Sequence, residues 1–153
     1  MTFCAKHFTI STGLGEGATE LNAFDNAMQD AHVGNYNLLR VSSILPPRCI
    51  ERNSIDIPQG GLLPIAYSYL TSMDSGIEIT AAIGVGIPAK VDSIGVIMEY
   101  SGYITRTNAE NTVRQMIEEA MKNRGIDIKN IIIRSRSALV KECTCVFSSI
   151  ALW

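Results

Sequence analysis

The chain has 153 residues, of which 46% are hydrophobic and 18% charged, and its formal net charge is −2. This size and composition favour one globular domain, residues 1–153, with a substantial core. The charge gives no electrostatic footprint for nucleic acid, and no apolar run reaches the roughly 20 residues of a membrane span, so we expect neither partner. The N-terminus lacks the layout of a signal peptide, which predicts a cytoplasmic protein with reduced cysteines.

Hydrophobic periodicity predicts the elements, because apolar residues alternate in half-buried strands and recur every three or four residues in helices. The first half of the chain predicts a strand at 3–11, a glycine loop at 13–17, a helix at 21–31, a strand at 35–41 and an irregular segment at 46–61. The second half predicts a hairpin of strands at 62–71 and 77–87, a strand at 94–103, a helix through 113–121, and strands at 129–137 and 143–152.

The second helix carries a start signal, because Thr107 and Glu110 match a capping box with Thr107 as N-cap. With about seven strands and two main helices in mixed order, the pattern favours an α/β fold over a doubly wound sheet. We expect a compact αββα-type sandwich of mixed or antiparallel sheets.

The glycine loop, Gly13 to Ala18, fits the dinucleotide fingerprint G-x-G-x-x-G/A between a strand and a helix. That fingerprint requires an acid about 20 residues further on, and no Asp or Glu lies between Ala31 and Ile50. We therefore favour glycines that let backbone pass close to another group. A small nucleotide-binding or metabolite-binding protein remains the alternative.

Two adjacent serines, Ser42 and Ser43, stand near the end of the second strand, and Pro46 and Pro47 close it. Proline cannot continue a strand ladder. One interpretation is a strand end with two small polar residues. The other, which we favour, is that Ser43 attacks its own backbone.

Two carboxylates stand beside apolar residues. Asp25 shares a helix face with Leu21, which places it at the solvent edge or holds it for a cation; the residues alone favour the edge. Glu99 interrupts an apolar strand. If its side of the strand is a core, burial raises its pKa and it can serve as a general acid; otherwise it faces solvent.

The cysteines and histidines form no metal-ligand pattern, so we expect no metal site. Cys143 and Cys145 share a strand face, and Cys4 and Cys49 are isolated. All four are expected to be reduced core thiols.

Four segments, in order and over essentially the whole chain, resemble the pyruvoyl-dependent arginine decarboxylases. These are GEGATELNAFDNAM (15–28), GNYNLLRVSSILPP (34–47), GVIMEYSG (95–102) and CVFSSIALW (145–153). The combination of Asn-x-x-x-x-Ser-Ser-Ile with Met-Glu-Tyr is specific, whereas either alone is not. The loop at 48–59 shows no close match.

The resemblance implies self-cleavage between Ser42 and Ser43, giving a small chain, residues 1–42, and a large chain, residues 43–153. Ser43 becomes a covalent pyruvoyl group, and no dissociable cofactor is needed. That group takes the substrate amine as a Schiff base and accepts electrons as CO2 leaves. The implied reaction converts L-arginine to agmatine and CO2, which suggests polyamine biosynthesis, although acid resistance uses the same reaction. A pyruvoyl decarboxylase for another amino acid is the alternative within this class.

The resemblance also implies roles by position. Glu99 matches the proton donor, and Asn37 matches a side chain needed near the cleavage site. Asp25 matches the residue that holds the guanidinium, with Leu21 lining the same pocket. Family members form homotrimers with active sites between subunits, so Asp25 and Ser43 are expected to come from different protomers.

Overall fold

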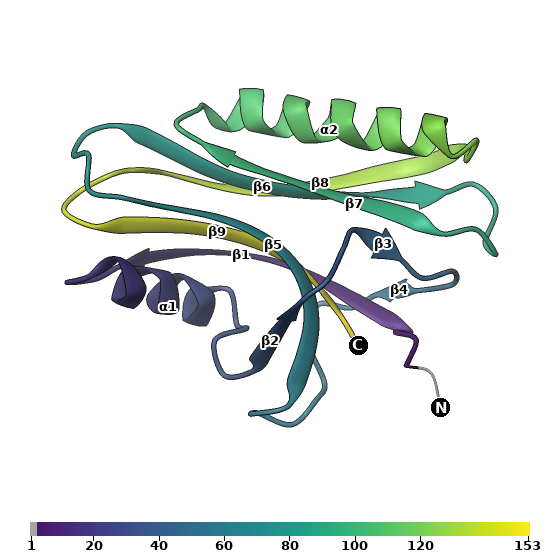
Figure 1. Ribbon diagram of the computed structural model, residues 1–153, viewed down its shortest axis with the longest axis horizontal. Coiled ribbons are helices and arrows are strands. Elements are labelled where there is room, and N and C mark those ends of the chain that lie inside the picture. The colour runs from purple at the N-terminus through teal and green to yellow at the C-terminus, as the bar shows by residue number, and fades with distance from the viewer. Residues whose placement is uncertain (1–2) are drawn as a thin grey trace.

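The computed structural model describes residues 3–153, which fold into four layers: helix, sheet, sheet, helix. The elements are β1 (His7–Glu16), α1 (Glu20–Asp30), β2 (Asn37–Arg40), β3 (Ile44–Leu45), β4 (Ile50–Glu51), β5 (Leu62–Ser72), β6 (Glu78–Pro88), β7 (Gly95–Gly102), α2 (Arg106–Asn123), β8 (Ile128–Leu139) and β9 (Thr144–Leu152). Figure 1 shows α2 over the sheet of β6, β7 and β8, and α1 under the sheet of β1, β5 and β9. The predicted αββα sandwich is confirmed.

The two sheets have different connectivity. Sheet A runs β2-β5-β9-β1-β4 and is mixed, because β2 pairs with β5 and β1 with β4 in parallel, while β9 is antiparallel to both its neighbours. Sheet B runs β3-β7-β6-β8 and is antiparallel throughout. The strands β3 and β4 were not predicted, because a two-residue strand shows no alternation.

The first strand corrects two expectations. It spans His7–Glu16 rather than residues 3–11, because its ladder with β9 extends from Phe8 to Glu16. Gly13 and Gly15 therefore lie in β1, not in a loop. A Cβ on either would overlap a backbone carbonyl of α1, that of Ala27 or Ala23. The glycines let helix and strand approach closely, so their interpretation as a packing feature is confirmed. The expectation of a glycine loop at 13–17 is wrong, because β1 continues to Glu16.

The second helix begins at Arg106, and Thr105 is its N-cap, with its hydroxyl accepting from the Asn108 amide at 3.4 Å. The predicted capping box on Thr107 is therefore wrong. Glu110 accepts a hydrogen bond from the Ser135 hydroxyl of β8 instead, because the apolar stripe of α2 faces sheet B and turns Glu110 toward that strand. The helix ends at Asn123, and Arg124 is its C-cap, directly before Gly125.

The core has an inter-sheet part and a part under each helix. The central strand β9 is buried along its whole length, and burial raises the pKa of the Cys145 thiol to about 11. Cys143 is buried too, whereas Cys4 is exposed and Cys49 half-buried. The prediction of a core thiol was wrong for Cys4, because β1 starts only at His7.

Candidate active site

The Ser42–Ser43 segment is the crossing from one sheet to the other. It follows β2 of sheet A and leads directly into β3 of sheet B, and Figure 1 shows this connection rising between the two layers. β2 pairs with β5 only as far as Ile65, and β3 pairs with β7 only at Gly95 and Val96. Beyond these points β5 and β7 are edge strands, so the crossing lies at an open edge of the sandwich.

Hydrogen bonds hold the carbonyls of both serines. The Ile44 amide donates to the Ser42 carbonyl oxygen at 3.0 Å, which closes a three-residue turn around Ser43. The Ile97 amide of β7 donates to the Ser43 carbonyl oxygen at 2.8 Å. An amide aimed at the Ser42 carbonyl oxygen polarises that carbonyl and favours nucleophilic attack on its carbon.

Glu99 lies close to this turn along β7. It stands two residues beyond Ile97 on the same face of the strand, about 7 Å by strand rise. That face is the inter-sheet core, because Ile97 and the residue opposite Glu99, Ile83, both belong to it. The Glu99 side chain is only 26% exposed. Of the two environments left open by the sequence, the core-facing one is correct, with the side chain half-buried.

The Glu99 carboxyl is held with an incomplete set of partners. Within residues 3–153, its Oε2 atom is buried and has no hydrogen-bond partner. Burial raises the pKa of Glu99, and the nearby charge of Arg40 partly lowers it. A carboxyl whose pKa is raised by burial is a candidate general acid.

Arg40 is a member of this site that sequence reasoning missed. Its Nη2 atom lies 3.9 Å from Glu99 Oε1 and donates to the Tyr67 carbonyl oxygen at 3.0 Å. The available signal was a lone cation inside the apolar strand that precedes the two serines. The structure thus places Arg40 near Glu99, which lies on the strand whose Ile97 amide binds the Ser43 carbonyl.

The remaining candidates lie elsewhere in the single chain. Leu21 and Asp25 are on α1, which covers the outer face of sheet A. Leu21 is 75% exposed and borders a hollow of about 450 Å³ with Phe24 and Tyr69. Asp25 accepts a hydrogen bond from Gln29 at 2.7 Å.

Asn37 begins β2, at the end away from the serines. Its side-chain amide donates to the Gly60 carbonyl oxygen at 2.7 Å, and its backbone amide donates to Gly61. Within one chain this amide is therefore engaged with the turn before β5. Its expected role near the cleavage site stays a prediction.

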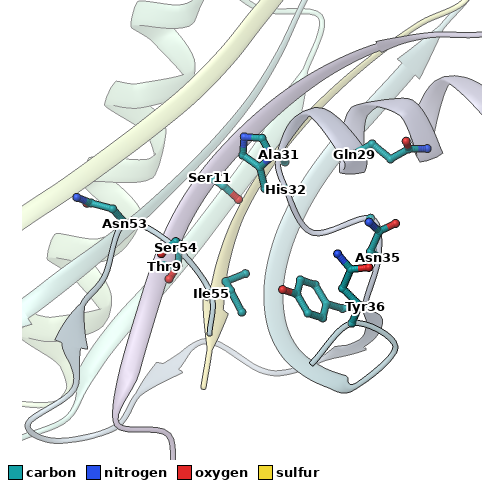
Figure 2. A pocket seen from close by; sticks show the side chains of 12 residues that line it. Thr9, Ser11, Gln29, Ala31, His32, Asn35, Tyr36, Asn53, Ser54 and Ile55 are labelled. Atoms are coloured by element: carbon teal, nitrogen blue, oxygen red, sulfur yellow. The ribbon is translucent and has the colours of Figure 1, made fainter. Parts of the chain in front are cut away.

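A separate cavity of about 390 Å³ lies beside the end of α1 and the outer face of β1 (Figure 2). Uncharged polar side chains dominate its wall, among them Thr9, Ser11, Gln29, Asn35 and Asn53. It contains none of the predicted site residues.

Within residues 3–153, no group of His, Cys, Asp or Glu side chains could hold a metal ion, and neither helix is long and apolar enough to cross a membrane.

Comparison with known proteins agrees with this geometry. The family model of pyruvoyl-dependent arginine decarboxylase matches residues 7–152. The chain is 42% identical over 147 residues to the pyruvoyl-dependent arginine decarboxylase of Methanococcus aeolicus, covering 95% of this chain and 89% of the relative. It is 40% identical to that of Methanocaldococcus jannaschii, with 95% and 88% covered, and 41% identical to that of Thermococcus kodakarensis, with 90% and 87% covered.

The chain belongs to the pyruvoyl-dependent arginine decarboxylase family. The matched region runs from the first residue of β1 to the last residue of β9, so it includes the serine crossing, Arg40 and Glu99. The name of the pyruvoyl-dependent arginine decarboxylases implies a covalent pyruvoyl group. The residues fit such a group, because Ser43 lies half-buried in a turn whose preceding carbonyl already accepts a hydrogen bond.

Proposed function

We propose that this protein cleaves itself between Ser42 and Ser43 and then decarboxylates L-arginine to agmatine and CO2. The observation that carries the proposal is the turn at Ser43, where the Ile44 amide donates to the Ser42 carbonyl and the Ile97 amide to the Ser43 carbonyl. The half-buried carboxyl of Glu99 lies two residues beyond Ile97 on β7. The single domain, residues 1–153, becomes a small chain, 1–42, and a large chain, 43–153. Met1 and Thr2 lie outside the described residues.

Self-cleavage follows from the position of the Ser43 hydroxyl next to the Ser42 carbonyl. The Ser43 Oγ bonds to the carbonyl carbon, the C–N bond between the two residues breaks, and the hydroxyl proton passes to the freed nitrogen. Elimination then breaks the Cβ–Oγ bond as Cα loses a proton, which releases Ser42 as a carboxylate. Water replaces the nitrogen, ammonia leaves, and a pyruvoyl group remains at position 43. The Ile44 amide stabilises the oxygen that becomes negative in the first step.

In the decarboxylation, the pyruvoyl group supplies the electron sink, and the protein supplies binding and the proton. Glu99, whose pKa is raised by burial, gives its proton to the substrate Cα after CO2 leaves. Asp25 accepts two parallel hydrogen bonds from the substrate guanidinium, and Leu21 packs beside it. Because Asp25 and Leu21 lie on the outer layer of their own chain, a neighbouring subunit contributes them, and Asn37 likewise acts across subunits.

The exposed apolar side chains support such an assembly, which we propose to be a homotrimer. Leu39 on β2, Tyr69 on β5 and Leu21 on α1 are large and exposed, and they occur on the elements around the open edge. Apolar patches of this kind mark protein contacts. We further propose that the protein is cytoplasmic and that its product enters polyamine biosynthesis.

A denaturing mass spectrum of the purified protein tests the cleavage. We expect two fragments that divide between Ser42 and Ser43, the larger with a blocked N-terminus. Ser43→Ala should leave one intact chain, because residue 43 then has no nucleophilic oxygen. Ser42→Ala is the matched control and should still cleave, because only the carbonyl of residue 42 reacts. Cleavage in Ser43→Ala would refute the mechanism.

Release of CO2 from arginine, lysine, histidine and aspartate tests the substrate. Arginine should react fastest, and a cleaved enzyme that prefers another amino acid would overturn the assignment of L-arginine.

Light scattering tests the assembly. Leu39→Glu should shift the mass from trimer toward monomer. Leu139 is also exposed and lies on β8 at the opposite edge, so Leu139→Glu should leave the trimer intact. A monomeric wild-type protein would exclude the proposed intersubunit site.

A further inference from the structure

The two oxygens of the Glu99 carboxyl have different surroundings. Oε1 faces the Arg40 guanidinium at 3.9 Å. Oε2 is buried and, among residues 3–153, has no hydrogen-bond partner. A proton on Oε2 removes the charge from the atom that water does not reach, whereas a proton on Oε1 would point at a cation. The site therefore favours protonation of Oε2.

Arg40 is held in place independently of Glu99. Its Nη2 atom donates to the Tyr67 carbonyl oxygen at 3.0 Å, and its guanidinium lies over the Tyr67 ring, 4.5 Å from the ring centroid. The same ring stacks on Phe147 of the core at 5.5 Å. Strand β5 thus fixes the cation both by a hydrogen bond and by cation–π contact.

The separation from Glu99 is too long for a hydrogen bond. Arg40 therefore acts on Glu99 through its charge and leaves the carboxyl free to gain and lose a proton. A direct bidentate pair would keep the carboxyl ionised and prevent proton donation. The carbonyl of Tyr67 and its ring hold the guanidinium at this intermediate distance.

Few other titratable groups occupy the strands around Glu99. β5 carries the phenols of Tyr67 and Tyr69 and no Asp, Glu, Lys, Arg or His. On β6 the residue opposite Glu99 is Ile83. Arg134 on β8 pairs with Ile83, so it lies one strand further away in the same register. Arg40 is the charge that counteracts the effect of burial on Glu99.

We propose that Arg40 is a positioning residue that holds its charge 3.9 Å from Glu99 Oε1 and so sets how readily the Glu99 carboxyl gives its proton to the substrate. This rests on the proposed role of Glu99 as the proton donor. Arg40 lies in the small chain, 1–42, and Glu99 in the large chain, 43–153. After self-cleavage the small chain therefore still serves the reaction, because it holds the cation that faces the acid on the large chain.

The test follows the Glu99 carboxyl directly, by 13C NMR of glutamate Cδ across pH in the purified enzyme, with Glu99→Gln identifying the signal. Arg40→Gln should move the titration of Glu99 upward by about one pH unit, the lower end of the effect of an adjacent opposite charge. Arg134→Gln is the matched control, because Arg134 carries the same charge but lies on β8, two strands from Glu99. In Arg134→Gln the titration of Glu99 should stay at the wild-type value.

Activity gives the second readout. The alkaline limb of kcat should move upward with the titration in Arg40→Gln. Arg40→Lys keeps a charge near the same place, so its titration should stay near the wild-type value even if Arg40→Gln fails to fold. No shift in Arg40→Gln, an equal shift in Arg134→Gln, or a large shift in Arg40→Lys would overturn the proposal. If the titration shifts but the wild-type enzyme does not decarboxylate arginine, the proposed function fails and the charge coupling between Arg40 and Glu99 stands.

Discussion

Because the carboxyl of Glu99 is half-buried, we predict that Glu99→Gln lowers the activity of the enzyme and raises its stability. Glu99→Gln keeps the shape of the side chain and removes both the proton and the charge. Proton transfer by a positioned side chain contributes about 10²–10⁴-fold to a rate, so kcat should fall by that factor while cleavage between Ser42 and Ser43 continues. Fragment masses report the cleavage and CO2 release reports turnover, and both are measured on the same preparation.

The stability effect follows from the buried oxygen. When Glu99 is ionised, Oε2 shares the negative charge, is buried and has no partner within residues 3–153. An unpaired buried group costs about 1–3 kcal/mol, and more when it is charged; the neutral amide of Glu99→Gln removes the part that is due to the charge. Because the side chain keeps 26% exposure and Arg40 offsets part of the charge, the lower end applies. We expect a gain of about 1 kcal/mol for Glu99→Gln at pH 8, which corresponds to about 2–4 °C in Tm for a chain of this size.

The pH dependence has a definite sign. Burial raises the pKa of Glu99 in the folded protein, so between the unfolded and folded pKa values the folded state holds the proton and the unfolded state does not. The stability of the wild-type protein therefore falls as pH rises through that window. Glu99→Gln has no such group, so its advantage should be present at pH 8 and absent at pH 4, below both pKa values.

Thermal unfolding by circular dichroism checks this in the uncleaved Ser43→Ala background at fixed protein concentration, since assembly also affects Tm. Glu119→Gln, on the exposed face of α2, is the matched control and should change Tm by less than about 1 °C. The reasoning about Oε2 would be wrong if the advantage of Glu99→Gln were the same at pH 4 and pH 8. The role in catalysis would be wrong if the variant turned over at the full rate.

Two further predictions concern the substrate and the packing. Asp25→Asn should raise KM for arginine about tenfold or more, because a charged hydrogen bond is worth about 1.5–3 kcal/mol, and should leave cleavage intact; an unchanged KM in steady-state kinetics would remove Asp25 from the pocket. Gly13→Ala should destabilise the uncleaved chain by about 1–3 kcal/mol, because its Cβ would overlap the Ala27 carbonyl of α1. Urea unfolding measures this, with Gly102→Ala, whose nearest neighbour is the tip of Tyr100 at 3.3 Å, as the milder control; equal losses in both would contradict the packing argument.

The sequence determined the layers of the fold and most of its elements. Apolar alternation in β5, β6, β7 and β9, and the stripe of α2, are local patterns that persist over eight or more residues, so periodicity detects them. It also determined the pair of serines before two prolines, because a hydroxyl pair at that place in the chain is visible without coordinates. Of these, the segments that carry the family resemblance include the serine pair, β7 and most of β9.

Tertiary structure decided the features that depend on what lies opposite a residue. In the sequence, the glycines of β1 fit a loop as well as a strand, and only the packing of α1 on them shows why they are needed. The short strands β3 and β4 are defined by their pairing with β7 and β1. Sequence alone placed Glu99 equally well in solvent or in a core, since one strand cannot tell which of its faces meets another sheet. Its partner Arg40 is 59 positions away along the chain, and only the packing of β2, β5 and β7 at one open edge brings the cation to the acid.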